Sequence, residues 1–462
     1  MKAWEYEREL TDNAVPVVLS EEEQTWEEML GESFHEDEKV KLLWGSNVPG
    51  SGAPERVLIG GIQSMHNMGY DVTGAEALID RALKALSEDD MAELNKVTAM
   101  VFYELSKSPK IEGHPFWKFA EYNTFEEMEK NAIFHKYDKV DVFSKEFEES
   151  NYYGWLAQIC GGAFGTALEG YTTDKLREAF GEIRGYIRKP NTYNDDITYE
   201  LAFLKAFDDY GFEVSSAQIA HEWVALVPAG WSAEEIALRN IRLGVYPPMS
   251  GYFNNPWREW IGAQMRGAIC GMVAPGNPYE AAKLAFKDGI ISHHNNGVLG
   301  EVFNAVMVSL SYVETDIRTI VEKAMDSIPK DSEYYSVIKF ALDKCIEHGE
   351  WEKAWRECEE KFVEYNWIHA YPNAASEIVS LWFGNGSFDE TMHISAMTGQ
   401  DVDCNAAQIA TIIGIISKDK EITAKWVEPI GDDLITYVRG MKHMKISELG
   451  KWTTESARKH YK

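Results

Sequence analysis

Apolar residues recur at a spacing of three and four along most of this chain, and this helical period most limits what it can fold into. Ala75–Leu86 carries its apolar side chains on one stripe, and Asp89–Leu105 continues in the same way. Such spacing is typical of amphipathic helices. The same pattern predicts further helices at Thr198–Phe207, Pro278–Phe286, Gly300–Tyr312 and Ala374–Phe383. Strand-like alternation is scarce, so the sequence predicts an all-α protein.

The length and the distribution of charge indicate more than one region. A chain of 462 residues favours two or three domains. Residues 1–150 hold 32 acidic and 15 basic side chains, which is more than half of the excess negative charge of the whole chain. Breaker residues at Asn47–Pro54 and a charged, aromatic stretch at 136–153 are candidate linkers. We therefore expect a mainly helical, acidic N-terminal region over 1–150, whose role could be partner binding or dimerisation, and a second domain over 151–462.

Charge and cysteine usage exclude several classes of protein. The formal net charge of −30 argues against binding of polymeric nucleic acid or of anionic membrane surfaces, because both need clustered Lys and Arg. The five cysteines are odd in number and form no C-x-x-C pair, so reduced thiols are expected. The sequence shows neither a signal-peptide pattern nor an apolar run of about 18 residues. These features predict a cytoplasmic protein.

Glycines interrupt the apolar stretch Trp155–Leu168. Gly161, Gly162 and Gly165 lie within it, although glycine costs about 1 kcal/mol relative to alanine inside a helix. A helix here must gain something in return, and the usual gain is the close approach of another helix or of a ligand. A phosphate-binding loop is the alternative, but neither G-x-G-x-x-G nor G-K-[ST] is present. A buried helix is the favoured interpretation.

Two acidic clusters each lead into an apolar helix. The first is Asn194-Asp195-Asp196, followed by the helix predicted at Thr198–Phe207. The second contains Asp401 and Asp403, followed by Ala406–Ile416, which is apolar nearly all round. The simplest explanation of each cluster alone is helix capping, because Asp and Asn are favoured at N-caps. Four carboxylates leading into buried helices also fit a cation site, and all-oxygen ligation suits Mg²⁺ or Mn²⁺ better than zinc.

At these residues the sequence resembles the ADP-ribosylglycohydrolase family, over about residues 155–440. Gly165-Thr-Ala-Leu-Glu-Gly170 is similar to the family's opening G-x-x-x-E-G, and Asn194–Thr198 stands in the place of T-D-D-T. Met265-Arg266 and the following Pro275–Pro278 resemble the family's central M-R and P-G-N-P. Ser292–Gly297 resembles its S/T-H…G turn. Gly399-Gln-Asp-Val-Asp-Cys-Asn405 resembles the family's D-T-D-T signature.

The resemblance implies an all-α, multi-helix domain with one or two Mg²⁺ or Mn²⁺ ions that hydrolyses a ribosyl glycosidic bond. Its substrate would be an ADP-ribosyl conjugate, an ADP-ribosylated protein among them, or a smaller riboside. By matching positions, the metal ligands would be Asn194, Asp195, Asp196, Asp401 and Asp403. The catalytic residues would be Glu169, Asp196 and Asp401. The substrate-binding residues would be Arg266, His293, Asn295 and Asn405.

Alternatives stay open for several of these residues and for the activity. Glu169 could pair with a basic side chain of a neighbouring helix, and Arg266 could be the partner of a buried acid. The chain also departs from the family pattern, because Ile197 and Val402 replace threonines, and Asn194 stands where a threonine ligand is common. An alternative function is therefore a catalytically degenerate protein on the same fold that binds ADP-ribose or a nucleotide.

Overall fold

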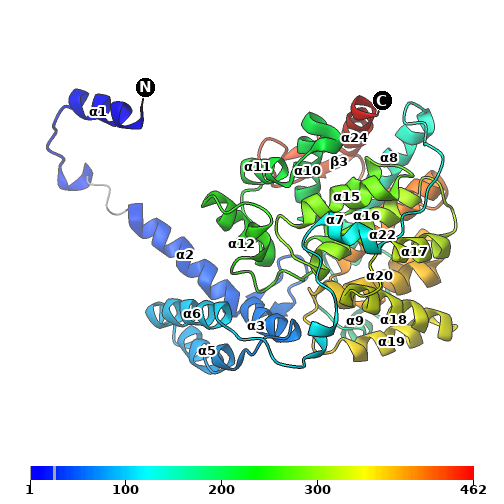
Figure 1. Cartoon of the computed structure of the whole chain (residues 1–462), viewed down its shortest axis with the longest axis horizontal. Helices are drawn as coiled ribbons and strands as arrows, with labels where there is room; N and C mark the ends of the chain where they lie inside the picture. Colours follow the sequence, from blue (N-terminus) through cyan, green and yellow to red (C-terminus); the bar gives the residue numbers. More distant parts are fainter. Residues whose placement is uncertain (1, 24–27, 462) are drawn as a thin grey trace.

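The computed structural model describes residues 2–23 and 28–461 and is built almost entirely of helices (Figure 1). The predicted all-α fold is confirmed. Within the described residues the strands form only two short antiparallel pairs, β1 (Ser46–Asn47) with β2 (Pro54–Glu55), and β3 (Asp433–Ile435) with β4 (His443–Lys445).

The helices before residue 145 are α1 (Ala3–Asn13), α2 (Glu28–Trp44), α3 (Val57–Asn67), α4 (Thr73–Glu76), α5 (Ile79–Ser87), α6 (Met91–Ser106) and α7 (Phe125–Met128). Those that follow are α8 (Lys145–Gly165), α9 (Thr173–Phe180), α10 (Asp196–Tyr210), α11 (Ser216–Leu226), α12 (Ser232–Arg242), α13 (Met249–Tyr252), α14 (Ala268–Met272), α15 (Pro278–Gly289), α16 (Asn296–Leu310), α17 (Ile317–Asp326), α18 (Glu333–Glu347), α19 (Trp351–Lys361), α20 (Ala370–Gly384), α21 (Phe388–Thr398), α22 (Val402–Ser417), α23 (Ala424–Val427) and α24 (Ile446–His460).

The helices expected from the apolar period are present, but one of them is divided into two helices. The stripe at Ala75–Leu86 is split between α4 and α5. Helix α5 ends where Asp89 adopts a positive φ of 54°, and α6 begins where the Asp90 carboxylate accepts a hydrogen bond from the Glu93 amide at 3.0 Å. Asp90 is thus an N-cap of the ordinary kind.

The buried side chains form two main clusters. The larger one fills the body, residues 145–461, and the smaller one lies between α2, α3, α5 and α6. Ala233, Trp257 and Trp260 of the body belong to the smaller cluster, so α2, α3, α5 and α6 pack directly on the body. In Figure 1 they lie at one side of it, next to α12.

The segment between α6 and α8 also packs on the body. Tyr122, Phe125 and Met128 are part of the body's core, and the Ile133 amide donates to the Asp326 carbonyl at 2.8 Å. This segment precedes the boundary expected near residue 150, but its buried side chains belong with the residues that follow. All five cysteines are buried and unpaired. None of the helices in residues 2–23 and 28–461 is long and apolar enough to cross a membrane.

Candidate functional site

The centre of the body is the contact between α8 and α22, and glycines make it possible. A Cβ added at Gly161 would lie 2.4 Å from the Ala406 carbonyl oxygen. One added at Gly165 would lie 2.2 Å from both N and Cα of Asp403. The close approach expected from the glycines is confirmed, and the partner is a helix. The end of α8, which leads to Glu169, is thereby set against the acidic start of α22.

The fold brings the two acidic clusters together at this point. Asp195 and Asp401 stand at the N-cap positions of α10 and α22. The side-chain NH₂ group of Asn194 donates to Asp403 Oδ2 at 3.2 Å and so joins the two clusters. Glu169 lies beside them, close enough for a hydrogen bond between its carboxyl group and that of Asp403. We call Glu169, Asp195, Asp196, Asp401 and Asp403 the buried carboxylate cluster.

Helix capping does not account for these acids. In the described structure neither Asp195 nor Asp401 makes a side-chain cap hydrogen bond. At the start of α10 the Asp196 amide donates to Asn194 Oδ1 at 2.6 Å, and at the start of α22 the Asp401 amide donates to Asn373 Oδ1 at 3.0 Å. One backbone N–H at each helix start therefore has a neutral side-chain amide as its acceptor, and the two N-cap carboxylates do not take that role.

Several carboxylate oxygens of the cluster are buried without a partner. Among the described residues, both oxygens of Asp196 and Oδ1 of Asp401 and of Asp403 accept no hydrogen bond. Asp196 is 0 % exposed and Asp403 is 4 % exposed. An unpaired buried charge costs several kcal/mol, and metal coordination is a usual way to offset that cost. Ligand atoms of Asp401, Asp403 and Cys404 all lie within 4.8 Å of one another.

Burial and mutual repulsion raise the pKa values of these acids. Burial, followed by the charge of Asp403, raises the pKa of Asp195 to about 6. The same two causes hold the pKa values of Glu169, Asp196 and Asp401 well above their usual range. Groups that repel one another in this way favour either protons or a bound cation.

The donor set fits a hard cation. Carboxylate oxygens suit Mg²⁺ and Mn²⁺. Cys404 adds little, because burial holds the pKa of its thiol well above the usual value and its Sγ faces Met265 Sδ at 3.7 Å. Asn194 presents its NH₂ group to Asp403 while its oxygen is engaged by the Asp196 amide. In this arrangement Asn194 orients the cluster and does not offer it an oxygen.

A cavity of about 690 Å³ opens beside the cluster. Glu169, Asp195, Asp401 and Asp403 line one part of it, and Asp196 lies behind them. The other walls come from distant parts of the chain and include residues that sequence reasoning missed: Ser46, Asn47, Gly50, Glu55, Arg188, Trp231, Glu234, Trp367 and Tyr437. For most of these no motif or spacing signals a role.

The four residues expected to bind substrate do not line this cavity. Arg266, 1 % exposed, forms ion pairs with Asp288 Oδ2 at 2.5 Å and Glu234 Oε1 at 3.3 Å. His293 exchanges a hydrogen bond with the Ser292 hydroxyl at 2.7 Å, and burial holds its pKa well below the usual value, so it is neutral. This geometry matches the alternative role of Arg266, which is to pair with a buried acid.

The two asparagines serve the packing around the cavity. Asn295 accepts from the Tyr122 amide at 3.1 Å and donates to Glu259 at 3.3 Å. Asn405 donates to Asn373 Oδ1 at 2.8 Å, the same oxygen that receives the Asp401 amide. Asn405 thereby supports the start of α22 from outside the cavity.

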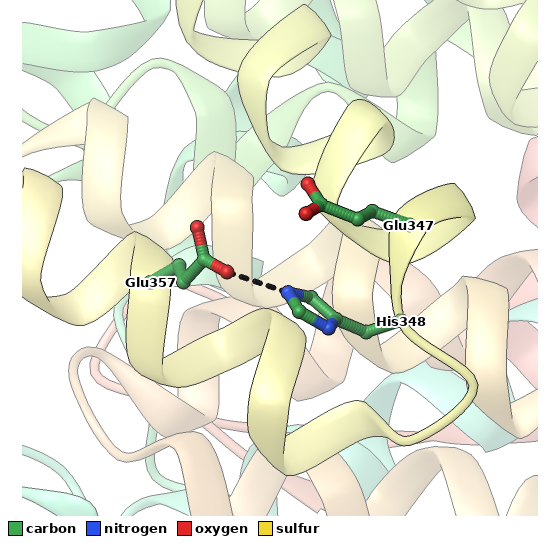
Figure 2. Close-up of side chains that lie close together, drawn as sticks. All are labelled: Glu347, His348 and Glu357. Atoms are coloured by element: carbon green, nitrogen blue, oxygen red, sulfur yellow. Dashed lines mark hydrogen bonds and ion pairs between the residues drawn. The ribbon is translucent and has the colours of Figure 1, made fainter.

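A second group with metal-ligating side chains lies near the protein surface, at the end of α18 and on α19. Figure 2 shows this surface cluster, which consists of Glu347, His348 and Glu357, with a hydrogen bond of 2.5 Å between His348 Nε2 and Glu357 Oε1. The Lys344 ammonium lies 2.8 Å from Glu347 and 2.5 Å from Glu357. The acids of the surface cluster thus already have a cationic partner.

Two comparisons with known proteins find matches for this chain. The family model described as ADP-ribosylglycohydrolase matches residues 146–459. A solved chain of an "ADP-ribosylglycohydrolase-related protein complex" has a TM-score of 0.51 and 17% sequence identity, and the match covers 69% of this chain and 100% of that chain. At that identity the likeness concerns the fold alone. The comparison with curated proteins gives no match. Because the family model spans more than half of the sequence, the chain belongs to the ADP-ribosylglycohydrolase family.

Proposed function

We propose that this protein is a metal-dependent hydrolase that cleaves a ribosyl glycosidic bond, in an ADP-ribosyl conjugate or a related riboside. The observation that carries this proposal is the buried carboxylate cluster, with its unpartnered oxygens, at the edge of a cavity of about 690 Å³. Family membership supports the glycohydrolase chemistry. The cavity is large enough to enclose a small-molecule substrate.

The residues would divide the work as follows. Asp195, Asp196, Asp401 and Asp403 would hold one or two Mg²⁺ or Mn²⁺ ions. Bound ions would orient the ribose and activate water as Lewis acids. Cleavage at a ribosyl carbon develops positive charge in the sugar ring, and the carboxylates of Asp401 and Asp403 at the cavity wall favour that charge.

Glu169 is suited to carry the proton. It lies at the cavity, and burial is the first cause that holds its pKa well above the usual value. A carboxyl group in such surroundings keeps a proton that it can give to a leaving group and later regain from water. The Glu169 side chain is therefore the proposed acid and base of the reaction.

The test is hydrolysis by the purified full chain with Mg²⁺ or Mn²⁺. ADP-ribosylated arginine, ADP-ribosylated serine and simple ribosides would be incubated with the protein and with Asp401→Asn, and the released ribosyl product measured. We expect release of product from at least one of these substrates and its loss in the variant. If the protein binds no divalent ion and Asp401→Asn leaves hydrolysis unchanged, the proposal fails.

A second candidate is a protein that holds ADP-ribose or a nucleotide without cleaving it. It is favoured by the engaged oxygen of Asn194 and by the apolar side chains of Ile197 and Val402, where the family pattern has hydroxyl groups. Calorimetry that shows tight binding of ADP-ribose, together with no product after long incubation with either metal, would select it over the hydrolase.

A further inference from the structure

The N-terminal hairpin, which we define as Ser46–Glu55, rests on the part of the body that carries Glu169. The Val48 amide donates to the Ala53 carbonyl at 2.9 Å and closes its turn. A Cβ on Gly50 would lie 2.3 Å from the Thr166 carbonyl oxygen and 2.6 Å from Glu169 Oε1. The Tyr171 hydroxyl donates to the Ser51 carbonyl at 3.2 Å. The turn is therefore in van der Waals contact with the proposed acid.

Buried tryptophans fix both ends of the hairpin. Before it, the Trp44 indole donates to the Thr98 hydroxyl at 2.7 Å. After it, the Trp257 indole of the body donates to the Val57 carbonyl at 2.9 Å. Both indoles are almost completely buried. The N-terminal hairpin is consequently a built wall of the cavity, and its glycines and prolines shape a turn.

Glu55 extends from this wall into the cavity. The Ser46 hydroxyl donates to Glu55 Oε1 at 2.8 Å across the strand pair. Burial raises the pKa of Glu55, while hydrogen bonds from Ser46 and from the Trp231 side chain act in the opposite direction. A carboxylate has about four acceptor positions, so two donors leave it free to accept from a ligand.

Glu55 and Glu169 line the same cavity. Ala53, two positions before Glu55, packs beside Gly170, because a Cβ added at Gly170 would lie 2.7 Å from Ala53 Cβ. Trp231 lines the cavity with Glu55, and its side chain is near enough to Glu55 to lower the pKa of that carboxyl group. Aromatic rings stack on planar heterocycles, and carboxylates accept from N–H groups.

We propose that the N-terminal hairpin forms a second subsite of the cavity, at which Glu55 and Trp231 bind a planar heterocycle that carries an N–H donor. This inference rests on the proposed function for the placement of a ribosyl group near Glu169. The heterocycle could be the base at the far end of an ADP-ribosyl substrate, or a base attached directly to the ribose as the leaving group. In either case residues 46–55 contribute to substrate selection.

The experiment measures binding by calorimetry in the presence of Mg²⁺, with ligands that differ only in the exocyclic amine of the base. One arm compares ADP-ribose with its analogue that carries unsubstituted purine in place of adenine. The other arm compares adenosine with purine riboside. We expect a preference of at least about tenfold for the amine in one arm, since a hydrogen bond to a charged group contributes that much. The arm that shows it identifies the source of the heterocycle.

Two variants and a control assign the preference to the hairpin. Glu55→Gln should reduce the preference to less than twofold, because its side chain can turn a donor toward the amine. Ser46→Ala, which frees Glu55 from its partner across the strands, should reduce the preference partially. Glu76→Gln, at an exposed position of α4, should leave it unchanged.

Several outcomes overturn the inference, and they differ from those that overturn the hydrolase. A preference below twofold in both arms, no binding of any of the four ligands, or a preference that survives Glu55→Gln would each refute the second subsite. Because the readout is binding, a Glu55-dependent preference in a protein that releases no product would uphold the subsite and refute the hydrolase. Release of product without a Glu55-dependent preference would uphold the hydrolase and refute the second subsite.

Discussion

The buried carboxylate cluster and the surface cluster both gather acids, and they differ in what balances the negative charge. At the surface, the Lys344 ammonium lies between Glu347 and Glu357, and water reaches all three side chains. In the body, the acids at the starts of α10 and α22 influence one another mainly by repulsion, and four of their oxygens have no partner in the described structure. A count of acidic residues does not separate the two clusters, but unsatisfied buried oxygens do.

This difference also explains how the chain tolerates the buried cluster. Close packing of α8 on α22 fixes the backbone of Asp403, and the side-chain oxygens of Asn194 and Asn373 each accept one backbone hydrogen bond at a helix start. The carboxylates are thus held at rigid positions, at which the proposed function would place a cation. The surface cluster needs none.

The largest expected effect is on catalysis. Asp401→Asn removes one negative charge from the cavity wall, and we expect kcat/KM with Mg²⁺ to fall by at least about 100-fold, as is usual when metal sites lose a charged group. Glu357→Gln makes the same chemical change in the surface cluster and should leave kcat/KM unchanged. Equal losses in the two variants would erase the distinction between the clusters.

The next effect is on the packing that holds the buried cluster. Gly165→Ala places a Cβ 2.2 Å from the backbone of Asp403, so α8 and α22 must move apart. We expect a loss of about 1–3 kcal/mol in the free energy of unfolding, typical of overpacking, and weaker cation binding. Denaturant unfolding and calorimetry measure the two quantities. Gly349→Ala, where nothing lies within 4 Å of the added Cβ, is the matched control. A normal cation affinity in Gly165→Ala would show that the glycine contact does not position Asp403.

A smaller effect links the buried cluster to pH. The pKa of Asp195 is raised to about 6 in the folded state, from about 3.9 for an unfolded aspartate. The folded metal-free protein therefore binds more protons between these values, and its stability falls as the pH rises through them. A bound cation relieves this repulsion, so Mg²⁺ should raise the thermal midpoint more at pH 8 than at pH 5. Equal increases at both pH values would contradict this expectation.

The smallest effect concerns the surface cluster. His348→Ala removes the hydrogen bond shown in Figure 2, but the side chains are partly exposed and their charges are screened by water. We expect little change in the thermal midpoint, with or without Mg²⁺, in differential scanning fluorimetry. A metal-dependent stabilisation that disappears in this variant would reveal a cation site where the structure shows a lysine.

The sequence predicted the helical fold because the spacing of its apolar residues depends only on residues that are close together in the chain. It also indicated that another helix or a ligand comes close to α8, since glycine is costly inside a helix, but it did not identify α22 as the partner. The residue types of the two acidic clusters suggested a shared cation site, but only the family resemblance placed them together, because Asp196 and Asp401 are 205 positions apart.

The rest of the cavity depends on contacts that no local pattern reports. Asn47–Pro54 has the composition of a linker, but its glycines and prolines shape a turn that packs on Glu169. Arg266 matches a motif position, yet its burial among Glu234 and Asp288 is decided by tertiary packing. Glu55 and Trp231 meet across about 175 residues of sequence, and neither lies in a recognisable motif.

Anomalous scattering from a crystal of the full chain soaked in Mn²⁺ tests the central claim most directly. It locates every bound ion without reference to turnover, and it reports on both clusters in one map. We predict one or two Mn²⁺ peaks among Asp195, Asp196, Asp401 and Asp403, and no peak at Glu347, His348 and Glu357. A map with no peak in the buried carboxylate cluster, or with a peak in the surface cluster alone, would contradict the account.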